Sequence, residues 1–93
     1  MRTIERSTAF KRDYKRESKR PHGAALDDVL VPVLQALAAD QPLEQRHRDH
    51  DLSGDWAGYR ECHVKPDLLL IYRQPDANTL RLARLGSHSE LFG

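Results

Sequence analysis

Hydrophobic residues in the first part of the chain recur every three to four positions, which is the period of a helix. The broadest apolar face lies between residues 24 and 39 and predicts a helix there; its members are Leu26, Val29, Leu30, Val33, Leu34 and Leu37. Pro32 falls inside this pattern and predicts a kink or a break. Phe10 and Tyr14 form a narrower stripe, which predicts an earlier helix over residues 8–19.

Two local signals bound the first helix. Ser7 precedes it and is expected to act as its N-cap, because a serine hydroxyl accepts a hydrogen bond from a free backbone amide of the first turn. The segment Pro21-His22-Gly23 is expected to end it, because proline and glycine interrupt helices. The two helices are therefore expected to form a hairpin.

The C-terminal half shows the alternation that is typical of β-strands. Residues 59–64 alternate, so Cys62 and Val64 are expected to face the core while Glu61 and His63 lie on the opposite face or at its rim.

Further strands and turns follow the same reasoning. Residues 68–72 are continuously apolar, which suits a central strand that is covered on both faces. Residues 80–84 alternate again, and residues 74–78 read as the hairpin turn between these two strands. Residues 3–5 predict a short N-terminal strand, and the chain is expected to end in a polar tail after Gly86.

Residues 40–58 are polar and rich in turn formers, and they predict a long ordered loop pinned by Leu43, Leu52 and Trp56. Loops of this length in compact domains often carry functional residues. The whole pattern predicts one α+β domain over residues 1–93. Its N-terminal strand and helical hairpin are expected to pack on one face of a mostly antiparallel sheet of about four strands.

Composition narrows the function classes. Cys62 is the only cysteine, which excludes an internal disulfide and favours a cytoplasmic location. The longest apolar run is far too short to span a membrane, and no signal peptide is visible. The net charge is only +1, but residues 1–20 carry eight basic side chains against three acidic ones. A basic helix of this kind either follows a phosphate backbone or is simply a solvated face.

Histidines are the most conspicuous chemistry-bearing residues. The chain has five, and four of them lie at predicted loops or strand ends: His47, His50, His63 and His88. Asp67 follows directly after Pro66. Histidine is the side chain best suited to proton transfer near neutral pH. RNA supplies its own nucleophile, the ribose 2′-hydroxyl, so an enzyme that cuts RNA needs a base, an acid and positive charge for the transition state.

Two stretches of the chain resemble a known family. One reads Asp49-His50-x-Leu52-x-Gly54-x-Trp56-x-Gly58-Tyr59-Arg60-x-x-His63-Val64-x-Pro66-Asp67-x-x-Leu70-Ile71-Tyr72, and the other reads Gly86-x-His88-x-x-Leu91-Phe92-Gly93. Both look like the YafQ branch of the RelE/ParE toxin superfamily. The N-terminal helices agree more loosely, so the match covers essentially the whole chain and is most specific over residues 49–72.

The resemblance implies a RelE-like fold and a ribosome-dependent mRNA endonuclease, the toxin of a type II toxin–antitoxin pair, that uses no cofactor and no metal. The implied partners are a cognate antitoxin, mRNA and the ribosome, with no membrane. The residues that match the family's catalytic positions are His50, His63, Asp67 and His88. Arg84 matches a residue near the scissile phosphate, and Phe92 matches an aromatic that helps to position RNA. Leu68 departs from members that carry an aromatic there, which puts base stacking at that point in doubt.

Two other function classes stay open at this stage. The histidines and Asp67 are acceptable Zn²⁺ ligands, although a close ligand spacing such as His-x-x-x-His is absent. The second class is a ParE-like or otherwise non-catalytic module that acts on a protein target. ParE-like members, however, lack the histidine set.

Single residues also have simpler interpretations. Trp56 and Tyr59 are expected to anchor the core rather than stack on bases. Arg60 either touches phosphate or braces the loop. Asp67 caps its turn or serves the site, and Cys62 is expected to be a small core residue. Alternation alone places Arg84 on the face of Leu80 and Leu82.

Overall fold

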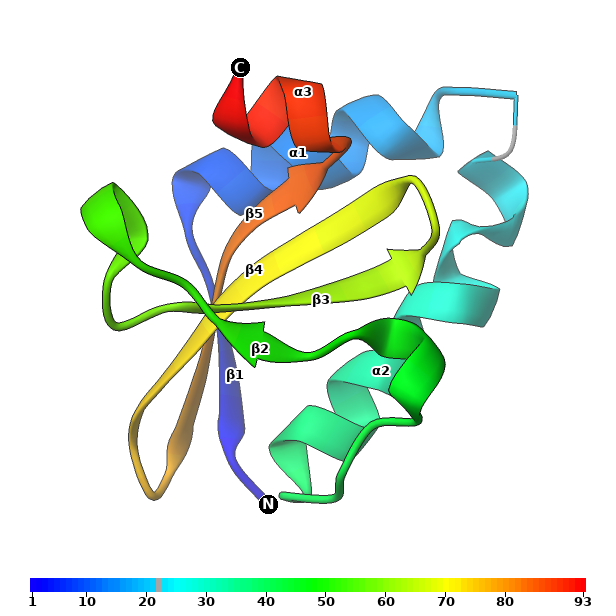
Figure 1. Ribbon diagram of the computed structural model, residues 1–93. Helices are drawn as coiled ribbons and strands as arrows, with labels where there is room; N and C mark the ends of the chain where they lie inside the picture. The colour runs from blue at the N-terminus through cyan, green and yellow to red at the C-terminus, as the bar shows by residue number, and fades with distance from the viewer. Residues whose placement is uncertain (22) are drawn as a thin grey trace.

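The computed structural model describes residues 1–21 and 23–93. Within these residues the chain forms a five-stranded sheet in the order β1-β5-β4-β3-β2 (Figure 1). The strands are β1 (Thr3–Arg6), β2 (His50–Asp51), β3 (Arg60–Lys65), β4 (Leu68–Asp76) and β5 (Thr79–Gly86). β1 runs parallel to β5, and the other neighbours are antiparallel. The predicted α+β class and mostly antiparallel sheet are confirmed.

Helices cover the sheet. They are α1 (Thr8–Ser18), α2 (Leu26–Ala38) and α3 (His88–Phe92), with short 3-10 helices η1 (Gly23–Ala25), η2 (Gln45–His47) and η3 (Gly54–Trp56). Ser7 caps α1 as predicted, because its hydroxyl oxygen accepts from the Phe10 amide at 2.9 Å. None of the described helices is long and apolar enough to cross a membrane.

The main core lies between one face of the sheet and the helices α1 and α2. It joins Phe10 of α1 and Leu30 and Val33 of α2 to Leu70 and Tyr72 of β4. Cys62 and Val64 also point into it, as the alternation of β3 predicted. Both long helices therefore cover the same face, as expected.

A smaller cluster covers the opposite face. Leu69 and Ile71 of β4 pack there with Leu91 of α3, together with Ala83, Leu52, Trp56 and Tyr59. β4 is thus buried on both sides and lies at the centre of the sheet, which confirms the interpretation of its apolar run. Leu52 and Trp56 pin the long loop on this face, and Leu43 pins it on the other.

Several boundaries differ from the prediction. Pro32 was expected to kink or break the second helix, and α2 continues through it, so of these two outcomes the break does not occur. Proline removes the hydrogen bond to the carbonyl of Asp28, and Asp28 is exposed near the start of α2, where water can replace it. The predicted separator includes His22, which lies outside the described residues.

The hairpin turn is shorter than predicted. β4 runs to Asp76, and the turn is reduced to Ala77 and Asn78, whose amide donates to the Asp76 carboxylate at 2.8 Å. A register shift between Arg73 and Asp76 lets the strand include Pro75.

Apart from the short 3-10 helices, two of the described elements were not predicted. β2 lies inside the segment expected to be a loop and makes the fifth strand. The expected polar tail forms α3, which starts with a capping box in which Ser87 and Glu90 exchange side-chain and backbone hydrogen bonds.

Candidate active site

The pairing of the strands places the chemistry-bearing residues in two neighbouring rows. His50 of β2 pairs with Glu61 of β3, Glu61 pairs with Ile71, and Ile71 pairs with Arg84 of β5. The next row holds His63, Leu69 and Gly86. Side chains of directly paired residues share a face. Ile71 and Leu69 pack in the smaller cluster, so both rows belong to the face opposite the main core, as predicted for His63.

Backbone carbonyls fix how the histidines of β2 and β3 present their rings. Nδ1 of His50 lies 2.6 Å from the carbonyl oxygen of Arg48, and Nδ1 of His63 lies 3.4 Å from that of Pro66. A carbonyl oxygen can only accept, so each Nδ1 carries the hydrogen and donates. Nε2 is then the nitrogen that exchanges protons in each ring.

Both Nε2 atoms face the same carboxylate. Oε1 of Glu61 lies 3.7 Å from Nε2 of His50 and 3.8 Å from Nε2 of His63. Glu61 is only 5% exposed, so its charge is poorly screened by water. The sequence had placed Glu61 on the face of His63, but it gave no reason to include it in the site, because its approach to His50 requires the pairing of β2.

An open hollow of about 450 Å³ brings three of the four candidate catalytic residues together: His63, Asp67 and His88. Asp67 lies at the exposed turn between β3 and β4, and within the described chain no hydrogen bond marks it as a turn cap. His88 is the first residue of α3, and its ring centroid lies 5.1 Å from that of Phe92. His50 does not line this hollow and is connected to it through Glu61 and His63.

Arg84 is held at the edge of β5. A register shift between Ile71 and Tyr72 gives β5 one extra residue, which moves Arg84 off the face of Leu80 and Leu82. The prediction from simple alternation was therefore wrong. The guanidinium donates to both carboxylate oxygens of Asp13 on α1, at 2.7 and 3.3 Å.

Asp13 is buried, at 3% exposure, and also accepts from the Leu85 amide. Burial alone would raise the pKa of this carboxyl. The hydrogen bonds from Arg84 and Leu85, with the charges of Arg84 and Arg16, outweigh burial and lower it. Asp13 is thus a buried anion that fixes the guanidinium of Arg84.

A second ion-pair group ties α1 to α3. Glu90 lies 2.6 Å from Arg20 and 3.5 Å from Arg16. The Ser87 backbone amide is the main reason that the pKa of Glu90 falls to about 2. Since Ser87 directly precedes His88, this group also fixes the start of the helix that carries His88.

Arg60 braces the loop that carries His50. Its guanidinium contacts Asp49 at 3.2 Å and Asp51 at 2.5 Å, the residues on either side of His50. Tyr72 donates its hydroxyl hydrogen to Asp49 at 2.5 Å. Of the two roles open to Arg60, the structure therefore supports the brace.

The remaining candidate residues, Trp56, Tyr59 and Cys62, help to pack the fold. Trp56 and Tyr59 pack edge to face against each other, and both contact the smaller cluster, as expected for core anchors. Cys62 is fully buried, and burial raises the pKa of its thiol to about 12, so it stays protonated. In the described part of the chain, no group of three or more histidine, cysteine or acidic side chains is arranged to hold a metal ion.

Comparisons with known proteins agree on one family. Residues 2–93 match the family described as the bacterial toxin of type II toxin–antitoxin system, YafQ. The mRNA interferase toxin YafQ of Escherichia coli (strain K12) is 39% identical over 92 residues, which cover 99% of this chain and 97% of that protein.

Solved structures point the same way. YafQ in the E. coli DinJ–YafQ complex is 37% identical, with full coverage of both chains and a TM-score of 0.86. A metal-bound toxin from Helicobacter pylori is 45% identical, covers 99% of this chain and 100% of its own, and has a TM-score of 0.81. The chain therefore belongs to the YafQ family of toxins from bacterial type II toxin–antitoxin systems.

Proposed function

We propose that this toxin is an endoribonuclease that cuts mRNA on the ribosome by proton transfer, without a metal. The observation that carries the proposal is the meeting of His63, Asp67 and His88 around one hollow, with His50 joined to it through Glu61. The relative in E. coli is named an mRNA interferase, which supports the same class of reaction.

The proposed reaction needs only groups of the chain and of the RNA. One histidine takes the proton of the 2′-hydroxyl while the 2′-oxygen attacks the adjacent phosphorus. A second histidine gives a proton to the 5′-oxygen as its bond to phosphorus breaks. The products are a 2′,3′-cyclic phosphate and a 5′-hydroxyl. The negative charge of Glu61 stabilises an imidazolium at His50 or His63. Arg84, which Asp13 holds outside the hollow, is the proposed source of positive charge for the phosphorane-like transition state once the RNA lies across β5.

The openness of the site supports a need for the ribosome. A hollow of about 450 Å³ between two turns and a short helix offers little to hold a flexible strand in line for attack. Positioning contributes several orders of magnitude in rate. We propose that the ribosome supplies it, and that Phe92, which packs beside His88, helps to orient the RNA.

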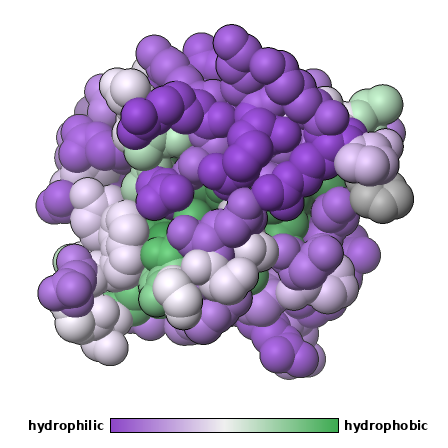
Figure 2. Space-filling model, turned by 90° about the horizontal axis from the view of Figure 1, so that it is seen from above, coloured by the Kyte–Doolittle hydropathy of each residue, from purple (hydrophilic) through white to green (hydrophobic). Residues whose placement is uncertain are grey.

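Surface charge supports contact with RNA. Lys11, Arg12 and Lys15 of α1 are exposed, as is Lys19 just after it, whereas the acids Asp13 and Glu17 of α1 are buried against arginines. Viewed from the end that carries α1 and α3, the surface is largely hydrophilic (Figure 2). The whole chain, acting as one domain in the cytoplasm, would be inhibited by a cognate antitoxin, as DinJ accompanies YafQ in E. coli.

The test uses toxin stripped with EDTA and returned to Mg²⁺-containing translating ribosomes. We expect full cleavage, with cyclic or 3′-phosphate ends and 5′-hydroxyl ends. A metal nuclease would activate water instead of the 2′-hydroxyl and would lose activity when its metal is removed. This outcome has to be tested because the toxin from H. pylori is metal-bound. Absence of any cleavage would favour a ParE-like module that acts on a protein.

A further inference from the structure

β3 extends beyond its outer neighbour. β2 pairs only with Arg60 and Glu61, so among the described residues no strand lies beside the rest of this edge of β3. An uncovered backbone carbonyl near a core must find another donor. The carbonyl oxygen of His63 finds one in His47, whose Nδ1 lies 2.6 Å away. Because a carbonyl oxygen only accepts, His47 carries its hydrogen on Nδ1 and donates it.

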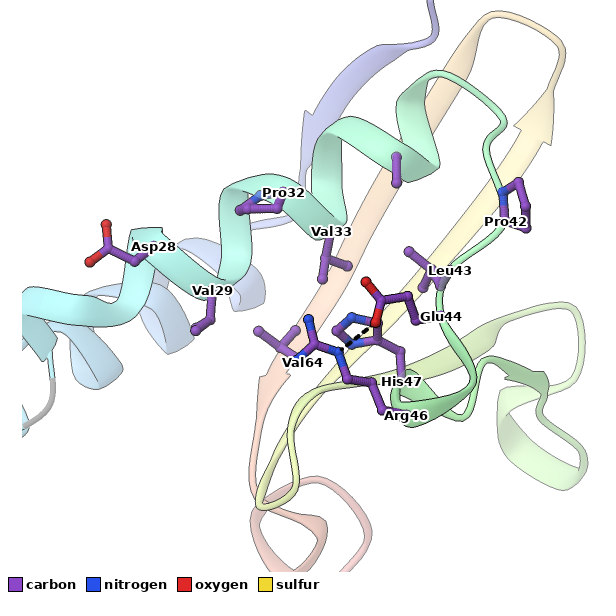
Figure 3. A pocket seen from close by; sticks show the side chains of 11 residues that line it. Asp28, Val29, Pro32, Val33, Pro42, Leu43, Glu44, Arg46, His47 and Val64 are labelled. Carbon is purple, nitrogen blue, oxygen red and sulfur yellow. Dashed lines mark ion pairs between the residues drawn. The ribbon is translucent and has the colours of Figure 1, made fainter.

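His47 is itself held in place by packing. It ends η2, and its amide donates to the carbonyl oxygen of Glu44 at 3.0 Å. Its half-buried ring lies in a hollow of about 230 Å³ between α2 and residues 42–47, near Leu43 and Val64 (Figure 3). The loop is pinned to the main core through Leu43. The donor thus has a fixed place relative to β3.

We propose that His47 is a positioning residue, which holds the backbone of His63 and thereby the catalytic imidazole. The hydrogen bond is made one residue before the irregularity that separates His63 from Lys65 in the pairing with β4. At such an irregularity the hydrogen bonds between the two strands are disrupted, so strand pairing alone holds the backbone less tightly than in a regular strand. With His47 in place, Nε2 of His63 stays opposite Glu61 and at the wall of the hollow shared with Asp67.

His47 acts through His63 and not on the RNA. It does not line the hollow that His63 shares with Asp67 and His88. The hollow of about 250 Å³ that it does share with His63 lies on the side of Val29 and Val64 and contains neither Asp67 nor His88. Its Nδ1 is engaged by a backbone carbonyl, and its ring lies against the α2 side of the loop (Figure 3). The role of His63 in cleavage rests on the proposed function, whereas the contact between the two residues does not.

The test compares two substitutions of similar shape. His47→Asn places an amide hydrogen close to the position of Nδ1, whereas His47→Phe keeps a ring and removes the donor. We expect His47→Phe to lower kcat about 10²-fold with KM little changed, because a displacement of about 1 Å in a catalytic group has that effect. His47→Asn should keep most of the activity and the pH profile of the parent, because His47 transfers no proton in the reaction.

A second readout does not depend on cleavage. In ¹H–¹⁵N spectra of the free toxin, His47→Phe should move the ring and backbone signals of His63, and His47→Asn should leave them near their original positions. Thermal melts exclude unfolding, and His47→Leu replaces the phenyl variant if the larger ring does not fit. A parent toxin that cuts no RNA would overturn the proposed function alone, since the spectra still test the contact.

Two results would overturn the inference. One is a folded His47→Phe or His47→Leu that is as active as the parent with His63 signals unchanged. The other is a folded His47→Asn that is as inactive as the donor-free variant, because the imidazole itself would then be needed.

Discussion

At the scale of single residues, His50, His63, Asp67 and His88 are expected to be needed for cleavage but not for folding. None of the four belongs to either hydrophobic cluster. Each alanine substitution should lower the cleavage rate by about 10²–10⁴-fold, the usual contribution of a proton-transfer group. Cleavage assays on ribosomes beside thermal melts measure both effects.

Asp55→Ala provides a matched control for Asp67→Ala, because Asp55 is exposed on η3 and does not line the hollow. It should leave cleavage unchanged. If His63→Ala and His88→Ala were both as active as the parent, the active site would lie elsewhere.

Glu61→Gln tests whether a negative charge is needed between the two histidines. The substitution keeps the shape of the side chain and removes the charge that lies 3.7 and 3.8 Å from the two Nε2 atoms. An imidazolium formed during the reaction would lose its partner. A loss of about 1.4 kcal/mol in the transition state lowers the rate about tenfold, and we expect at least this effect on kcat.

Glu44→Gln is the matched control, because Glu44 is exposed and pairs only with Arg46 among the described residues. Steady-state kinetics on ribosome-bound mRNA would separate the two variants. Equal rates for Glu61→Gln and Glu44→Gln would show that the charge of Glu61 does not contribute to cleavage.

At the scale of elements, α1 is joined to β5 through Asp13 and to α3 through Glu90, and these contacts predict a loss of stability in acid. Both carboxyls have a lower pKa in the folded protein, below 3.8 for Asp13 and about 2 for Glu90 against an ordinary 4.5. A lowered pKa stabilises the fold above the unfolded value, and this stabilisation disappears as the pH falls through the folded value. The melting temperature should therefore drop between about pH 4.5 and pH 2.

The double variant Asp13→Asn, Glu90→Gln should melt lower at pH 7 and show a flatter slope in that acid range. Asp28→Asn changes an exposed carboxylate on α2 and should keep the slope of the parent. Melting curves recorded from pH 5 to pH 2 test this, and an unchanged slope in the double variant would contradict it.

The elements with a clear period could be predicted from the sequence, whereas the short ones could not. α2 is long enough to show a helical period, and β4 shows a continuous apolar run. β2 has two residues and α3 has five, so neither offers a pattern to read. Ser87 and Glu90 have the spacing of a capping box, but this signal was missed, and a polar tail was expected there.

The site was predicted only as far as single residues allow. The alternation of β3 put His63 on the correct face. The extra residue of β5 leaves no mark in the sequence, so the position of Arg84 could not be obtained from alternation. Glu61 and Asp13 depend on pairings between segments far apart in the chain, which no local pattern contains.

At the scale of the whole molecule, the charge distribution predicts how the toxin meets its antitoxin. The outer side of α1 carries exposed lysines and arginine, while its acids face inward. We expect a tight complex with a small antitoxin whose toxin-binding segment is acidic, and an association rate that falls as salt rises. The charge reversal Lys11→Glu, Lys15→Glu should slow association at low salt and reduce this salt dependence.

Stopped-flow binding to the product of the adjacent gene measures both quantities, and a pull-down at low salt is the simpler form of the test. No association under those conditions would contradict the expected partner.

The most direct test of the whole account is a single 2′-deoxy substitution at the scissile nucleotide of an mRNA on translating ribosomes. If the RNA supplies the nucleophile and the histidines move the protons, cleavage at that phosphate should be abolished, while unsubstituted mRNA is cut to a 2′,3′-cyclic phosphate and a 5′-hydroxyl. Rapid cutting at the substituted position would contradict the account, because an activated water would then be the nucleophile.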